Sequence, residues 1–429
     1  MSSTTRRPLF VAATVITVLG AALAGCSTET GSGSGSDSSS GEEQVLSVAT
    51  NGGAALLETI PAFEEANPGV KIDVKDYPQN YREVIGTQLT GGNAPDIIQI
   101  PPGGGNNISV KVAGAQGYYE DLSDAAWAGD VPEAAAEQLT TDEGALVAVP
   151  MILASIGGIY NQGAVDAAGL TIPETWSEVL QFCQDAQAAG KVAYGLGLSD
   201  TWTTQMVPYA LTSTLVYGPN PEFITEQIAG SATFADSEWG TAFDKYLEMD
   251  EQGCFNANPN GTPYSQVQDA IREGDTLATV SVASETASIA STGPSDLELT
   301  YAAFPATDDP ADTFLPTSVG PAFGINADSS NKDLAATFLE YLATADAQIT
   351  YATAFGDVAA MPGDLTQESQ VAEVVQEFTT QQKITTFPDR LWPSTTVQPE
   401  MFDGVQSLFS GQSTVEDVLA NMDNAFSAN

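Results

Sequence analysis

Histidine, cysteine and acidic residues build most catalytic and metal sites, and this chain uses them very unevenly. Its 429 residues include no histidine, 3 cysteines, and 56 Asp and Glu against 12 Lys and Arg. The absence of histidine from the sequence excludes Ser-His-Asp and Cys-His catalysis and histidine-containing zinc sites. The remaining chemistry would have to come from carboxylates, hydroxyls, amides and aromatic rings.

The carboxylates form no catalytic or metal-binding pattern. No local spacing singles out an acid and a base for glycoside hydrolysis, and no Asp-x-Asp-x-Asp-Gly calcium loop occurs. The run Gly103-Gly104-Gly105 lacks the following Gly-Lys-Ser/Thr of a phosphate loop. We therefore expect a protein that is not an enzyme and that uses no cofactor and no metal.

The overall charge and composition exclude further classes of protein. A net charge of −44 repels phosphate backbones and anionic lipid head groups, so we expect no nucleic-acid partner. A hydrophobic content of 42 % is sufficient for substantial cores. The length predicts two or three domains, or one architecture of two large lobes.

The N-terminus has the features of an export signal. Arg6 and Arg7 precede an apolar stretch, residues 9–23, which ends in Leu23-Ala24-Gly25-Cys26. This ending resembles the lipobox of bacterial lipoproteins, in which the cysteine is acylated. We expect a signal peptide over 1–25, a lipid-anchored Cys26, a Ser/Gly-rich tether over 26–44, and a folded body on the extracellular face of the cell membrane, held there only by its lipid anchor.

Two further cysteines, Cys183 and Cys254, remain in the exported part. Outside the cell an even pair is compatible with one disulfide, and we expect this bond. Two separate buried thiols are the alternative.

Along the body, apolar residues alternate between strand and helix spacing. Strands are expected over 45–50, 70–74 and 96–100, with helices over 56–66 and 81–89 between them. Further strands are expected over 192–198 and 276–283. Capping-box spacings at Thr175/Glu178 and Ser413/Glu416 predict two helix starts. Alternating strands and helices indicate an α/β fold with parallel sheets.

Several segments together resemble extracellular solute-binding proteins of the maltose-binding type (family 1), the lipoprotein capture subunits of bacterial ABC sugar importers. The matching segments, in chain order, are Phe63-Glu-Glu-Ala-Asn-Pro-Gly69, Gly91-Gly-Asn-Ala-Pro-Asp-Ile97, Val149-Pro150, Gly158-Ile-Tyr-Asn161, Pro173-Glu-Thr-Trp-Ser-Glu178, Phe323-Gly-Ile-Asn326 and Ser410-Gly-Gln-Ser-Thr-Val-Glu-Asp-Val418. Their order and spacing cover nearly the whole exported chain.

The resemblance implies a two-lobed, periplasmic-binding-protein-like α/β fold with three interlobe crossings and a ligand cleft between the lobes. The crossings are expected near 153–156, 300–303 and 324–329. Lobe 1 is expected over 45–153 plus 302–326, and lobe 2 over 154–301 plus 327–429. The implied partners are a small-molecule solute and the permease subunits of an ABC importer, and we expect a monomer.

The ligand-binding residues are expected on segments that flank the cleft. Trp202 follows a strand in a loop where relatives present an aromatic and a polar residue, and Asp200 lies beside it. Glu285 lies near a position where relatives often place an aromatic contact. The remaining candidates are residues at strand ends or in irregular segments, namely Asn51, Tyr81, Asn106, Asn107, Gly320 and Trp392. Trp127, Trp176 and Trp239 are interpreted as packing residues.

The ligand class follows from the charges and the aromatic residues. Beyond the signal, Lys and Arg residues are scattered singly along the sequence, so an anionic ligand is disfavoured. A neutral oligosaccharide is the favoured ligand. A cationic polyamine, paired with Asp200 and Glu285, is the alternative, and a surface adhesin or a secreted glycosidase is less favoured.

Overall fold

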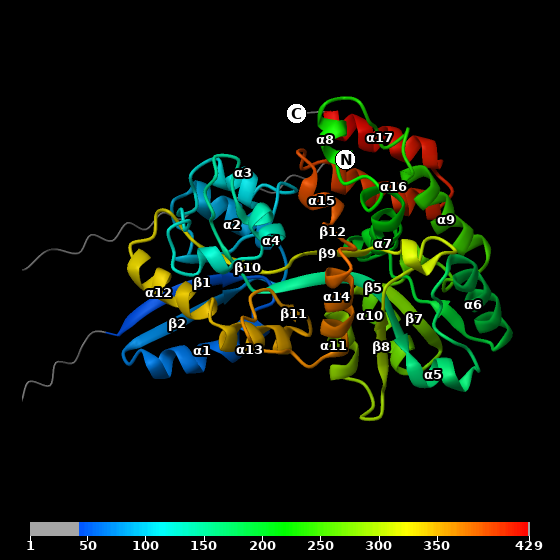
Figure 1. Ribbon diagram of the computed structural model, residues 1–429, viewed down its shortest axis with the longest axis horizontal. Helices are drawn as coiled ribbons and strands as arrows, with labels where there is room; N and C mark the ends of the chain where they lie inside the picture. The colour runs from blue at the N-terminus through cyan, green and yellow to red at the C-terminus, as the bar shows by residue number, and fades with distance from the viewer. Residues whose placement is uncertain (1–42, 428–429) are drawn as a thin grey trace, which may run out of the picture. The chain divides into compact units, whose positions relative to one another are not determined.

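The computed structural model describes residues 43–427, and these form a mixed α/β fold built on two β-sheets (Figure 1). The signal peptide, Cys26 and nearly all of the expected tether lie outside the described residues. None of the helices within 43–427 combines the length and the apolar character that a membrane crossing requires.

The first sheet has five strands, and its first three are parallel. Their order in space is β2 (Val70–Asp76), β1 (Gln44–Thr50), β3 (Ile97–Gln99), β10 (Ala322–Ile325) and β4 (Val149–Pro150). The alternating apolar residues that predict β1 and β2 pair in parallel register, while β10 runs antiparallel to both β3 and β4. The helices around this sheet are α1 (Ala54–Ala66), α2 (Tyr81–Thr90), α3 (Val110–Gly114), α4 (Glu133–Leu139), α12 (Lys332–Leu342) and α13 (Ala345–Phe355). This sheet and its helices, residues 44–151 and 321–361, are called the first lobe.

The second sheet is organised around the long strand β5 (Ile152–Asn161). The order is β12 (Ile384–Thr385), β9 (Leu315–Val319), β5, β7 (Thr276–Val282) and β6 (Val192–Tyr194), and β8 (Leu299–Ala302) and β11 (Val358–Ala359) also pair with β5. The helices here are α5 (Gln162–Ala167), α6 (Trp176–Ala188), α7 (Met206–Thr212), α8 (Phe223–Ile228), α9 (Trp239–Glu251), α10 (Tyr264–Arg272), α11 (Glu285–Ser291), α14 (Gln370–Thr380), α15 (Pro388–Leu391), α16 (Val397–Phe409) and α17 (Val415–Ser427). Residues 152–320 and 362–427 are called the second lobe.

The chain crosses between the two sheets three times, and two of these crossings lie at other positions than the sequence predicts. β4 and β5 are consecutive, so the first crossing lies at residue 151, next to the expected 153–156. Residues 300–303 do not cross, because β8 and then β9 pair with β5, and the chain returns at 320–321. Residues 324–329 do not cross either, since α12 and α13 continue to pack in the core of the first lobe. The last crossing lies at β11, which pairs with β5 while Ala359 still packs in the core of the first lobe.

Local sequence signals explain two of the helix starts. The Thr175 hydroxyl accepts a hydrogen bond from the Glu178 N–H, and Glu178 bonds back to the Thr175 N–H, which is the expected capping box of α6. At α17 the reciprocal pair is Thr414 with Asp417, one residue beyond the expected Ser413 and Glu416. The two carboxylates satisfy N–H groups that the first helical turn leaves without partners.

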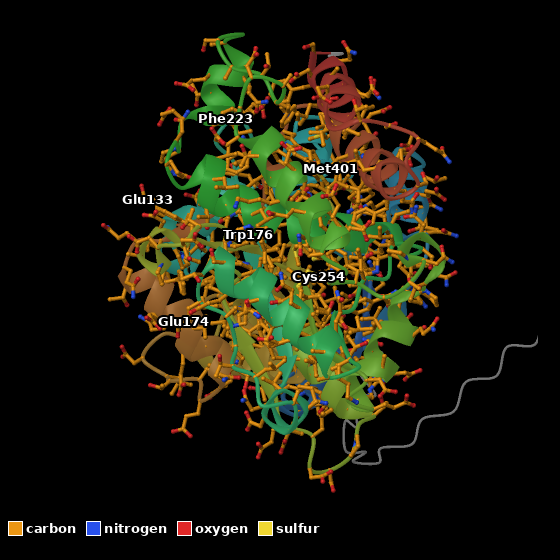
Figure 2. All side chains as sticks on the ribbon, turned by 90° about the vertical axis from the view of Figure 1, so that its right-hand side faces the viewer. Glu133, Glu174, Trp176, Phe223, Cys254 and Met401 are labelled. Carbon is orange, nitrogen blue, oxygen red and sulfur yellow. A yellow bond between two sulfur atoms is a disulfide. The ribbon has the colours of Figure 1, made fainter. Side chains whose placement is uncertain are left out.

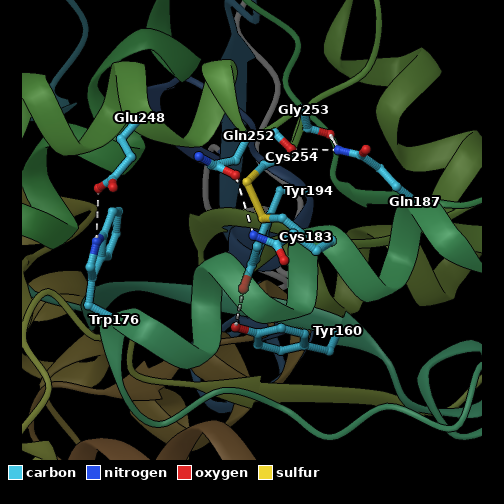
Figure 3. Close-up of a disulfide and its surroundings, with 10 residues drawn as sticks. Tyr160, Trp176, Cys183, Gln187, Tyr194, Glu248, Gln252, Gly253 and Cys254 are labelled. Carbon is cyan, nitrogen blue, oxygen red and sulfur yellow. Dashed lines mark hydrogen bonds between the residues drawn. A yellow bond between two sulfur atoms is a disulfide. The ribbon is translucent and has the colours of Figure 1, made fainter.

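A disulfide joins Cys183 on α6 to Cys254, which follows α9, as the sequence predicts (Figure 3). Gln187 on the same face of α6 donates to the Gly253 carbonyl at 2.8 Å. Trp176, at the start of α6, donates its indole N–H to Glu248 on α9 at 3.1 Å. Figure 2 views this end of the second lobe, where Trp176 and Cys254 are labelled. The disulfide and both hydrogen bonds therefore fix α6 to α9 and the turn after it.

Candidate ligand-binding cleft

Two adjoining cavities lie between side chains of the first and second lobes. The larger has a volume of about 390 Å³ and the smaller about 220 Å³. Both are lined by the same four residues: Arg82 on α2 of the first lobe, and Trp202, Gln205 and Gln398 of the second lobe. Because these residues belong to both cavities, we treat the two as one cleft.

The floor of the smaller cavity is apolar and comes from one face of β5. Ile152, Ala154 and Ile156 alternate along this strand, so they point to the same side, and Val282 and Phe355 line the cavity beside them. The residues between them face the other way, as shown by Ser155, which is fully buried and accepts a hydrogen bond from the Tyr301 hydroxyl. The strand period thus gives the cleft an apolar base beneath its polar walls.

Trp202 is the aromatic side chain that the sequence places in the cleft, and it lines both cavities. It belongs to the 3₁₀ turn Thr201–Gln205 and is partly buried. Its ring contacts Tyr264 edge-to-face, with centroids 4.9 Å apart. The indole is therefore held from behind while part of its surface stays open to the cleft.

Asp200 does not line either cavity, and its carboxylate has a different partner. It accepts a hydrogen bond from the Tyr264 N–H at 2.7 Å, at the start of α10. Tyr264 in turn supports Trp202. Asp200 is thus a positioning residue for the aromatic pair, one contact removed from the cleft.

Asn51 and Tyr81 line the larger cavity from the first lobe. The Asn51 backbone N–H donates to the Gln99 side chain. Asn51 is an exposed residue, so its side-chain amide is open to solvent. The Tyr81 hydroxyl donates to the Gln99 carbonyl at 2.6 Å, and burial raises the pKa of Tyr81 well above its usual value. Asn51 can therefore offer a side-chain amide to a ligand, whereas Tyr81 offers ring surface.

Asn106, Asn107 and Gly320 are not among the residues that line the two cavities. The buried Asn106 side chain accepts from the Ile108 N–H and so closes its own turn. Gly320 lies where β9 ends against β5, and a Cβ there would come within 2.5 Å of the Ile152 side chain. Its lack of a side chain serves the packing of the crossing strands.

Trp392 was expected to contact the ligand, and the structure contradicts this prediction. Its side chain is 1 % exposed and packs against Tyr209, Phe234 and Trp239 in the core of the second lobe. The sequence could not show this because the aromatic partners come from three distant segments.

Glu285 lies outside the residues that line the cleft. It accepts a hydrogen bond from Gln268 on α10 at 2.7 Å, and burial raises the pKa of its carboxyl. The polyamine alternative required both Asp200 and Glu285 at the ligand, and neither carboxylate lines the cavities. The structure therefore does not support a polyamine ligand paired with Asp200 and Glu285.

The structure brings together two arginines that appear scattered in the sequence. Arg82 and Arg390 both line the smaller cavity, together with Asp389. Desolvation and the nearby Arg390 guanidinium lower the pKa of Arg82. Anionic ligands are disfavoured only if the Lys and Arg side chains lie apart from one another, and Arg82 and Arg390 do not.

The run Gly103-Gly104-Gly105 explains how Arg390 reaches its position. The Gly104 N–H donates to the Arg390 carbonyl at 3.2 Å, and a Cβ on Gly105 would come within 2.6 Å of the Asp389 carbonyl. A Cβ on Gly103, where φ is +68°, would overlap the Arg390 carbonyl. The glycines thus let a first-lobe loop lie directly against the backbone of α15.

A larger cavity, of about 550 Å³, is lined by residues of α11, α13, α14 and the segments beside them. Its lining includes Asp357 and Glu368 but no aromatic and no basic side chain. Within 43–427, no group of three or more Cys, Asp or Glu could hold a metal ion. The cleft at Trp202 is therefore the better candidate for an organic ligand with apolar faces and many hydroxyls.

Comparison with known proteins identifies the relatives of this chain. The family model for bacterial extracellular solute-binding proteins matches residues 47–349. A multiple sugar-binding protein of Streptococcus mutans is 26 % identical over 151 residues, which is 35 % of this chain. That match spans about a third (34 %) of the relative's length.

Solved structures of low sequence identity share the fold. The solute-binding protein RafE in complex with raffinose has a TM-score of 0.74 at 20 % identity, covering 89 % of this chain and 98 % of its own. A sugar transporter protein from Bacillus licheniformis in complex with stachyose has a TM-score of 0.69 at 19 % identity, with the same coverage of both chains. These likenesses support the two-lobed α/β architecture.

Proposed function

Because this chain belongs to the family of bacterial extracellular solute-binding proteins, which are binding proteins rather than enzymes, we propose that it captures an oligosaccharide in the cleft at Trp202. We propose further that it delivers this ligand to the permease of an ABC importer. The protein would act as a monomer, anchored to the outer face of the cell membrane through Cys26.

The cleft itself is the observation that supports a carbohydrate ligand. Sugar rings have apolar C–H faces and polar edges, and the cleft offers the Trp202 indole together with amide groups from Asn51, Gln205 and Gln398. Gln398 donates to Gln205 at 3.0 Å, so these two amides are already oriented. The relatives whose names mention multiple sugars, raffinose and stachyose agree with this ligand class.

We also propose that the first and second lobes close around the ligand by rotation about the crossing segments. Three crossings restrict relative motion to opening and closing. Small-angle X-ray scattering with and without a saturating ligand would test this, because closure should reduce the radius of gyration. An unchanged radius would argue against closure.

A ligand screen tests the central proposal. Thermal unfolding should be measured for the purified full chain with a panel of mono- and oligosaccharides, followed by calorimetric titration of those that raise the Tm. A ligand present at 100 times its Kd should stabilise the folded state by about 2.7 kcal/mol. If no carbohydrate in a broad panel shifts the Tm, the carbohydrate proposal is wrong.

The anchor requires a separate test in cells. Cys26→Ala should abolish acylation and release the protein from the membrane fraction, because the acceptor thiol is lost. Cys183→Ala/Cys254→Ala would serve as the control, since it removes both cysteines of the disulfide in the folded body and keeps Cys26. Membrane attachment and processing of Cys26→Ala equal to the wild type would exclude the lipid anchor.

A further inference from the structure

We propose that the ligand of the cleft carries a carboxylate, as in an oligosaccharide that contains a uronic acid, and that Arg82 and Arg390 bind this group. The inference rests on the proposed carbohydrate-binding function and specifies the charge of the sugar. It replaces the neutral oligosaccharide favoured by the sequence.

The first argument is the position of the two side chains. Arg82 is on α2 of the first lobe and Arg390 is on α15 of the second, and both line the smaller cavity. A guanidinium group binds a carboxylate through two parallel hydrogen bonds. An anion between the two arginines would therefore contact both lobes at once.

The second argument is that these cations lack good partners within residues 43–427. Six other Lys and Arg residues form ion pairs with carboxylates at 3.2 Å or less. Arg82 has no ion pair and no hydrogen bond to any described side chain or backbone group outside its helix. The Arg390 Nε is buried without an acceptor, and its Nη1 lies 3.7 Å from Asp389, beyond hydrogen-bond distance. A buried donor such as the Arg390 Nε rarely lacks an acceptor unless a ligand or a water supplies one. Arg82 is exposed, so its guanidinium is accessible to a ligand.

The third argument is the balance of charge. Two guanidinium groups and one carboxylate, Asp389, line the smaller cavity, which leaves one positive charge. Glu83 lines the larger cavity, so the two positive and two negative charges of the whole cleft cancel, and the excess positive charge is confined to the smaller cavity. One excess positive charge matches a singly charged carboxylate better than a doubly charged phosphate.

The fourth argument is the surface next to the arginines. Trp202 lines the same cavity, and the β5 residues Ile152, Ala154 and Ile156 form its floor. A free inorganic anion would leave this apolar surface without a partner. A uronic acid residue would place its ring against the apolar surface and its carboxylate at the arginines.

The test uses matched sugars that differ only in charge. The full chain, purified in detergent, would be incubated with the mixed oligosaccharides from partial hydrolysis of uronic acid-containing polysaccharides. A second portion of each mixture would first be treated to reduce its carboxyl groups to hydroxymethyl groups. Equal amounts of the untreated and the reduced mixture would then compete for the protein. Bound sugars would be identified by mass spectrometry, and the best acidic and neutral pair would be compared by calorimetry.

We expect the acidic sugar to bind at least tenfold more tightly than its neutral counterpart. Arg82→Gln and Arg390→Gln should each remove most of this preference, because each should weaken binding of the acidic sugar more than binding of its neutral counterpart. Lys71→Gln is the matched control, because Lys71 is an exposed cation of the first lobe that pairs with Glu64. Higher salt should weaken binding of the acidic sugar alone.

The outcomes separate this inference from the proposed function. Binding of neutral sugars with no preference for the acidic ones would overturn the inference and leave carbohydrate binding intact. No binding of any sugar by the folded protein, monitored by its thermal transition, would overturn both. A preference for acidic sugars that persists in both arginine variants would show that the carboxylate is bound elsewhere.

Discussion

Replacement of Trp202 by alanine should weaken ligand binding strongly and should also lower the stability of the fold. Trp202 lines both cavities of the cleft, and its one aromatic contact within residues 43–427 is the edge-to-face pair with Tyr264. The substitution removes a surface that a sugar ring would cover. It leaves the supporting Tyr264 and Asp200 in place.

The magnitude follows from the area of the indole. An aromatic side chain buries about 150–250 Å², and one face open to a ligand is about half of this, or about 100 Å². At about 25 cal/mol per Å², loss of this face costs about 2.5 kcal/mol of binding free energy. This corresponds to a Kd about 60-fold higher. The other half of the indole packs against the protein, so the free energy of unfolding should also fall, by about 2.5 kcal/mol for the lost apolar contact and about 1 kcal/mol for the aromatic pair.

Calorimetric affinity and thermal stability measured side by side would test this reasoning. Trp392→Phe is the matched control, because Trp392 is 1 % exposed in the core of the second lobe. It should lower the Tm through lost packing while leaving the affinity within about twofold of the wild type. An unchanged affinity of Trp202→Ala, with a Tm lowered more than that of the control, would refute a role of Trp202 at the ligand.

Three further predictions concern stability. The double substitution Cys183→Ala/Cys254→Ala should lower the free energy of unfolding by about 2–5 kcal/mol, because the bond closes a long loop; equal urea midpoints with and without reductant would contradict this. Gly103→Ala should lower the Tm and weaken ligand binding, because the new Cβ would overlap the Arg390 carbonyl, whereas Gly117→Ala, also at positive φ but with open space around it, should lower the Tm without weakening binding. Burial raises the pKa of Asp357 well above its usual value. Folded Asp357 therefore keeps a proton that the unfolded chain releases above about pH 4, so the free energy of unfolding should fall as the pH rises from there, and Asp357→Asn should reduce that fall in urea titrations at several pH values.

The sequence predicts the fold well because the relevant patterns are local. The alternating residues of β1 and β2 and the capping box of α6 each lie within a few residues, and each appears in the structure at the expected place. The crossing segments are different. Whether a strand such as β8 crosses or pairs depends on β5, which is far away in the sequence, so two of the three crossings were placed wrongly.

The cleft is less predictable because each of its residues comes from a different segment. Trp202, Asn51 and Tyr81 were found from their positions near strand ends and helix starts, and they line the cavities. Arg82 and Arg390 were missed because α2 and α15 are far apart in the sequence and their arginines reach the same cavity only in the folded chain. The sequence signal for the position of α15 is the glycine run before α3, which contacts the α15 backbone.

That glycine run connects the fold to the chemistry of the cleft. Gly103, Gly104 and Gly105 allow a loop of the first lobe to contact the backbone of α15 directly. Because α15 has only four residues and carries both Asp389 and Arg390, this contact fixes the two charged side chains at the cavity. A side chain at Gly103 or Gly105 would overlap the carbonyl of Arg390 or Asp389 and would displace α15. The glycine run thus helps to determine where Asp389 and Arg390 lie in the cleft.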